Sequence, residues 1–197
     1  TAFSVTNGRF DKLSYDDTEL LQNKTASTIV INAQGRRVIP GLNDSHLHVV
    51  RGGRFYNLET RWEGLDSLAA GLDLIKQNAK ITPEGQWVRV IGGFSPYQFK
   101  EKRLPTSREL TDAAPNTPVF ILHLYSGGVL NKKGMEVLGI TKHSVAPQGS
   151  YYGKDADGEL TGRLIADPNP MILYQTIAAL PQMSGAEQLN SSKQFYT

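Results

Sequence analysis

The sequence predicts an α/β protein, and two observations carry that prediction. Short runs of branched and aromatic residues alternate along the chain with segments whose apolar residues recur at helical spacing. The run at residues 119–124 is almost wholly apolar, as in a strand that is buried on both faces of a sheet. Because strands that alternate with helices build sheets with helices packed on them, the pattern indicates α/β architecture.

The composition is that of a folded protein that is not specialised for nucleic acid or membranes. Of the 197 residues, 39% are hydrophobic and 20% are charged, which suffices for a packed core. The formal net charge of +2 is too small to argue for a polyanionic partner, and no apolar run reaches the roughly 18 residues of a membrane span. The lack of cysteine excludes disulfides, thiolate zinc sites and cysteine nucleophiles. These observations argue against nucleic-acid and membrane partners, leave a small-molecule partner open, and do not choose between cytoplasm and export.

The first forty residues show strand patterns with one short helix. Alternation and turn residues predict strands at residues 3–6, 28–32 and 37–39, and a helix at residues 18–22. Asn7-Gly8 and Gln34-Gly35 supply the turns. This segment is expected to contribute strands to a small sheet.

The remainder alternates between helices and strands with recognisable ends. We expect helices at residues 67–80, 106–113, 132–138, 171–180 and 185–196, and strands at 86–91 and 119–124. Thr106 or Ser107, followed by Glu109, forms a capping pattern, and Gly139 is placed to end the third helix. Residues 149–165 read as a hairpin that turns at Asp157-Gly158.

The segment that carries the most chemistry ends in His46-Leu47-His48. Residues 38–48 read as a strand, on which His46 and His48 project from the same face with Cβ atoms roughly 6 to 7 Å apart. Both imidazoles then reach one metal ion, although a catalytic zinc site takes three protein ligands plus water. Asp44 lies on the same face, where it either accepts a hydrogen bond from a ligand imidazole or makes a structural bond. The plain alternative is an ordinary pair of core or surface histidines.

These residues resemble the amidohydrolase superfamily, and specifically its amidohydrolase-3 (YtcJ-like) branch. Val38-Ile39-Pro40-Gly41-Leu42-Asn43-Asp44-Ser45-His46-Leu47-His48 resembles the signature of the first barrel strand of these enzymes. Further landmarks lie at residues 87–93, 104–106, 114–120, 130–140 and 155–162. The resemblance covers nearly the whole chain but only the N-terminal part of such an enzyme.

The resemblance implies part of a (β/α)8 TIM-barrel metal hydrolase. Residues 1–40 would supply β-sandwich strands, residues 41–80 the first barrel strand and its helix, and residues 81–197 an inserted α/β subdomain with the start of the next barrel helix. The intact enzyme would bind one or two divalent ions, zinc being our first expectation, and would hydrolyse a non-peptide amide or cyclic amide. His46 and His48 would be metal ligands, and the remaining catalytic residues would lie beyond the chain. The fragment alone is expected to be inactive.

The other histidines carry less chemistry. His123 lies within the apolar run at residues 119–124, where it either lines a substrate pocket or is a satisfied core histidine, the more frequent case. His143 is expected on the surface. Many members of the branch have a Gly-His pair where this chain has Tyr125-Ser126-Gly127-Gly128, so a histidine is not carried over and specificity should differ.

A second function class competes with the enzyme. The same sequence suits a non-catalytic α/β binding or assembly module derived from the family. A partial barrel should also expose the edge of the strand at residues 119–124 and the inner face of the first strand, so we expect self-association.

Overall fold

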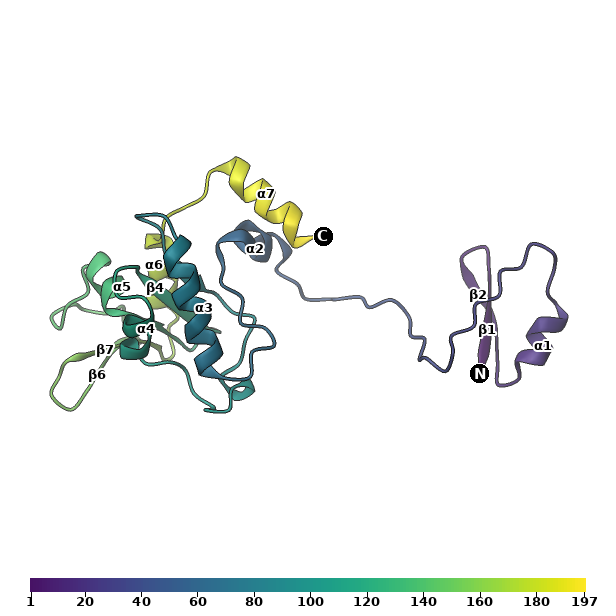
Figure 1. Ribbon diagram of the computed structural model, residues 1–197, viewed down its shortest axis with the longest axis horizontal. Coiled ribbons are helices and arrows are strands. Elements are labelled where there is room, and N and C mark those ends of the chain that lie inside the picture. Colours follow the sequence, from purple (N-terminus) through teal and green to yellow (C-terminus); the bar gives the residue numbers. More distant parts are fainter. The chain divides into compact units, whose positions relative to one another are not determined.

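The computed structural model describes residues 1–197, which form two compact units, Thr1–His46 and Leu47–Thr197. Their elements are labelled in Figure 1.

The first unit is built around an antiparallel hairpin of β1 (Ala2–Thr6) and β2 (Arg9–Ser14). Asn7 and Gly8 both have positive φ, at 51° and 75°, which is why the Asn-Gly pair forms the turn. A register shift between Ser4 and Val5 lets apolar residues of both strands share one face, where the rings of Phe3 and Phe10 lie 5.2 Å apart. The expected helix is present as α1 (Asp17–Gln22).

Two strands that we expected in this unit do not form. Residues 28–32 and 37–39 have no regular structure, and Ile29, Ile31 and Ile39 are exposed. A strand is stabilised by hydrogen bonds to a neighbouring strand, and no strand in the structure pairs with these residues. Conversely, β2 was missed because its polar sequence lacks a clear apolar face.

The second unit is organised by a five-stranded mixed sheet. Its strands are β3 (Val88–Val90), β4 (Val119–His123), β5 (Gly127–Leu130), β6 (Ser150–Lys154) and β7 (Leu160–Ala166), in the order β3-β4-β5-β7-β6. β3 and β4 are parallel, and the other neighbours are antiparallel. The α/β prediction is confirmed, whereas the structure does not show a partial barrel. β4 lies inside the sheet, so the expectation that it exposes an edge is wrong.

Helices precede, connect and follow these strands. They are α2 (Val49–Arg54), α3 (Leu68–Ile81), α4 (Ser107–Ala113), α5 (Lys132–Val137), α6 (Met171–Ala179) and α7 (Gly185–Phe195), with 3-10 turns η1 (Tyr56–Leu58) and η2 (Pro96–Gln98). Helices α3 to α7 were expected from the sequence, whereas α2, η1 and η2 were not. None of the helices has the length and apolar character needed to cross a membrane.

The sheet is covered on both faces, which explains the unbroken apolar run of β4. Alternate residues of the strand enter different clusters: Ile121 packs with Leu68 and Ile75 of α3. Phe120 packs on the other side with Ile172 and Leu173 of α6. Burying β4 on both faces stabilises the fold by roughly 1.5 to 3 kcal/mol for each large side chain removed from water.

The pair Gly52-Gly53 allows helix α7 to approach α2 closely, and the two helices lie side by side in Figure 1. A Cβ atom on Gly53 would lie 3.2 Å from the backbone of Ser192. The buried Ser191 hydroxyl donates a hydrogen bond of 2.7 Å to the Gly53 carbonyl and accepts one of 3.1 Å from the Asn57 amide. The two glycines thus permit close backbone approach from within a helix, because neither carries a Cβ atom.

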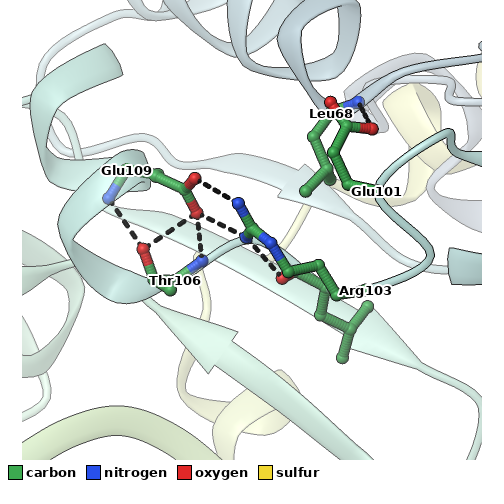
Figure 2. Close-up of polar contacts among 6 residues, drawn as sticks. Leu68, Glu101, Arg103, Thr106 and Glu109 are labelled. Atoms are coloured by element: carbon green, nitrogen blue, oxygen red, sulfur yellow. Dashed lines mark hydrogen bonds and ion pairs between the residues drawn. The ribbon is translucent and has the colours of Figure 1, made fainter.

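The turn at Leu104-Pro105-Thr106 is held by the capping network of Figure 2. Thr106 caps α4, with its hydroxyl accepting from the Glu109 amide at 3.2 Å while the Glu109 carboxylate accepts from the Thr106 amide at 2.8 Å. Arg103 donates two hydrogen bonds to the same carboxylate, at 2.7 and 2.9 Å, and these hold the pKa of Glu109 at about 2. Nearby, Glu101 accepts from the Leu68 amide at the start of α3. The predicted capping box is confirmed, and its role is structural.

Asn131 joins four segments through a fully buried carboxamide. Its oxygen accepts from the amides of Val119 and Gly134, at 2.9 and 2.8 Å. Its nitrogen donates to the carbonyls of Ala114 and Thr117, at 2.8 and 2.9 Å. Every hydrogen-bonding position of the side chain is used.

We expect Asn131→Ala to lower the free energy of unfolding by about 3 kcal/mol or more, because buried backbone groups on both sides lose their partners. Urea denaturation of the chain measures this loss. Asn116→Ala, at an exposed asparagine, is the matched control and should change stability by less than about 0.5 kcal/mol. A loss below about 1 kcal/mol for Asn131→Ala would contradict the assigned role.

Candidate functional site

The segment that contains His46 and His48 is not a strand. Residues 28–47 contain bends and irregular backbone, and His48 is the N-cap of α2. The Asp44 carboxylate accepts a hydrogen bond of 2.9 Å from the His46 amide, and the His48 carbonyl accepts one of 2.8 Å from the Gly52 amide. These local bonds take the place of a strand ladder, since no strand pairs with the segment. The prediction of a first barrel strand is therefore wrong for this structure, and with it the argument from strand alternation.

The two histidines lie on either side of the division between the units. His46 is the last residue of the first unit, and His48 follows Leu47 at the start of the second. Both side chains are exposed. Neutral imidazoles are good ligands for zinc and similar ions, so the donor type fits a metal site.

The ligand side chains that the structure brings together are too few for a complete metal site. The structure contains no group of three or more His, Cys, Asp or Glu side chains arranged to hold a metal ion. A catalytic zinc takes three protein ligands, so the chain offers at most part of a coordination shell. The assignment of His46 and His48 as ligands stays a prediction. The role of Asp44 toward an imidazole is also a prediction, because its observed bond goes to a backbone amide.

His123 lies at the carboxyl end of β4, half-buried against an aromatic ring. Its imidazole centroid is 5.9 Å from that of Phe94, and the Ser126 hydroxyl lies 3.5 Å from Nδ1. Burial lowers the pKa of His123, which favours the neutral ring near pH 7. The surroundings suit a packed histidine at least as well as a pocket residue. His143 is exposed, as expected.

A group of charged side chains beside β3 was not predicted from the sequence. Residue Glu59 forms a parallel bridge to Arg89, and the Thr60 amide donates to the Arg89 carbonyl at 2.7 Å. Three chain segments, at residues 59–61, β3 and β4, thus run in parallel. Their carboxyl ends meet at one edge, the usual position of ligand sites in parallel sheets. No local sequence pattern predicts this pairing, because Glu59 and Arg89 are thirty positions apart.

The charged side chains of this group are partly buried, and some of their polar atoms have no ion-pair or hydrogen-bond partner. The Arg61 guanidinium lies 3.7 Å from a Glu59 oxygen, 3.1 Å from a Glu63 oxygen and 3.9 Å from the centre of the Tyr56 ring. Arg89 is buried and donates to the Pro181 carbonyl at 3.3 Å, while its Nε has no hydrogen-bond partner. Burial lowers the pKa of Arg89 and raises that of Glu59 to about 7. The group fixes the edge of the sheet, and Glu59 changes its charge near neutral pH.

The raised pKa of Glu59 predicts that stability falls as the pH rises from about 4.5 to 7. In this window the folded state binds the Glu59 proton more tightly than the unfolded state, so deprotonation favours unfolding. The pKa difference corresponds to at most about 3 kcal/mol. Glu59→Gln should remove this contribution, which denaturant unfolding at a series of pH values detects as the difference from the wild type.

The exposed Glu84 provides the control for this experiment. Glu84→Gln should leave the pH dependence of unfolding unchanged. Identical pH profiles for the wild type and Glu59→Gln would show that burial does not raise the pKa of Glu59.

Comparison with known proteins gives the family. Residues 29–196 match the sequence profile described as the amidohydrolase family. The chain belongs to the amidohydrolase family. The resemblance drawn from His46-Leu47-His48 and the later landmarks is thereby confirmed, whereas the fold of the amidohydrolase barrel is not seen in this part of the chain.

Three curated proteins align with most of this amidohydrolase chain. The N-substituted formamide deformylase of Arthrobacter pascens is 30% identical over 151 residues, 76% of this chain and 28% of that protein. The putative amidohydrolase YtcJ of Bacillus subtilis is 30% identical over 159 residues, 79% of this chain and 30% of that protein. Protein LONG AFTER FAR-RED 3 of Arabidopsis thaliana is 27% identical over 139 residues, 70% of this chain and 23% of that protein.

The chain thus aligns with less than a third of the length of each of these relatives. No solved structure matches it significantly.

Proposed function

We propose that this chain is part of a metal-dependent amidohydrolase that cleaves a non-peptide carbon–nitrogen bond, with His46 and His48 among the metal ligands. The observation that carries the proposal is the His46-Leu47-His48 motif inside the segment that matches the family. The first two relatives support the reaction class, since one is named a deformylase of N-substituted formamides and the other an amidohydrolase. The substrate is a small molecule whose amide or cyclic amide gives an acid and an amine on addition of water.

The roles of the chain's own residues follow from their positions. His46 and His48 would supply two neutral nitrogen donors, for which zinc is our first choice of ion. A bound divalent ion polarises a carbonyl group and makes water a stronger nucleophile near neutral pH. The Asp44 carboxylate, which accepts from the His46 amide, fixes the backbone just before the pair. The α2 hydrogen bond from Gly52 to the His48 carbonyl fixes the backbone just after it. Further ligands must come from residues outside the group described here.

Hydrolysis by the full gene product tests this proposal. We expect release of amine from at least one member of a panel of N-alkyl formamides, N-aryl formamides and cyclic amides. His46→Ala and His48→Ala should each lower kcat/KM by about a thousandfold or more, a loss of about 4 kcal/mol in transition-state stabilisation.

His143→Ala is the matched control, because His143 is an exposed histidine far from the motif in sequence. It should retain wild-type kcat/KM. Full activity of the His46 and His48 variants would contradict the ligand assignment. A folded gene product that binds metal but hydrolyses no member of the panel would favour a non-catalytic module.

A further inference from the structure

A guanidinium and two tyrosine rings from three separate elements meet on the surface of the second unit. The Cζ atom of Arg51, in α2, lies 5.8 Å from the ring centre of Tyr125 and 5.7 Å from that of Tyr174, in α6. The two ring centres are 6.3 Å apart, with their planes inclined by 50°. Arg51 Nη1 donates a long hydrogen bond of 3.3 Å to the Tyr125 hydroxyl. We call Arg51, Tyr125 and Tyr174 the arginine–tyrosine cluster.

The cluster presents unused hydrogen-bond donors to solvent. Arg51 is exposed, and Tyr125 and Tyr174 are 52% and 39% exposed. A guanidinium has five N–H donors, of which Arg51 uses one, and none of the ion pairs in the structure involves Arg51. The α2 helix carries Arg51 and Arg54 but no acidic residue. The local charge is therefore positive and is not balanced within α2.

Two members of the cluster adjoin buried groups, and the third lies in a tight turn. The α2 helix is tied to α7 through the bond from Ser191 to the Gly53 carbonyl. Tyr125 sits in the tight turn between β4 and β5, after Leu124, which has a φ of 52°. Tyr174 follows Leu173, which is anchored in the core. Preorganised groups lose little conformational entropy on binding, so this arrangement suits a ligand better than three mobile side chains would.

The cluster also lies next to a candidate metal ligand within the same unit. His48 caps α2 and Arg51 is three positions later, about one helical turn along the chain. A small molecule that reaches His48 with its amide group could extend another substituent toward the cluster.

We propose that Arg51, Tyr125 and Tyr174 form a subsite for a carboxylate carried on an apolar or aromatic part of the substrate. This inference rests on the proposed function for the scissile amide, but the subsite is defined by its own residues. The planar guanidinium matches a carboxylate with two parallel hydrogen bonds, and the two inclined tyrosine rings offer apolar contacts to the group that bears it. A neutral substituent would gain the ring contacts but not the charge-assisted bonds.

Binding of benzoate and benzamide to the 197-residue chain tests the subsite without metal or turnover. The two probes share a phenyl ring, and only benzoate carries the negative charge. We expect benzoate to shift the NMR signals of Tyr125 and Tyr174 and to bind at least about tenfold more tightly than benzamide. Arg51→Met should remove this preference, and Arg51→Lys should restore only part of it, because lysine lacks the planar pair of donors.

The exposed Arg108 of α4, which makes no charge pair in the structure, supplies the matched control. Arg108→Met should leave benzoate binding unchanged, and dispersed NMR spectra verify that each variant is folded. Equal binding of the two probes, no binding of benzoate, or equal effects of Arg51→Met and Arg108→Met would each overturn the proposal. Because no hydrolysis is measured, these results are independent of whether the gene product cleaves an amide.

Discussion

The second unit depends on the buried carboxamide of Asn131. This one side chain binds the end of α4, the loop before β4, the first residue of β4 and the first turn of α5. These segments meet at the amino end of β4, where backbone amides and carbonyls would otherwise be buried without partners. From that end, β4 runs between two apolar layers. His123 lies at its carboxyl end, and Tyr125 lies in the turn that follows. The positions of His123 and Tyr125 thus depend on the hydrogen bonds that Asn131 makes at the other end of β4.

Local chemistry made much of this unit predictable. Thr106 and Glu109 mark the start of α4, and Asp157-Gly158 marks the turn between β6 and β7, because caps and tight turns depend on neighbours within a few residues. Pairings between distant segments were not predictable in the same way. The bridge between Glu59 and Arg89, and the cluster of Arg51 with two tyrosines, join residues that no periodicity connects.

The histidine motif also shows that a local pattern does not predict pairing with a distant strand. Its residue types and its proline-glycine approach identify the family, which the match over residues 29–196 confirms. The strand inferred for it does not form, because alternating side chains produce a strand only where a neighbouring strand supplies hydrogen bonds. Residues 28–32 and 37–39 fail for the same reason. The residue types of a motif and its backbone conformation therefore support separate predictions. Only the residue types are a property of the local sequence.

Binding of one divalent ion by His46 and His48, as proposed, can be measured by a zinc titration of the 197-residue chain followed by NMR of the four histidine rings. We expect the signals of His46 and His48 to shift together, and His46→Ala to abolish the shift of His48. The signals of His123 and His143 should stay in place. Equal or larger shifts at His123 or His143, or an unchanged response of His48 in the His46→Ala variant, would contradict the claim.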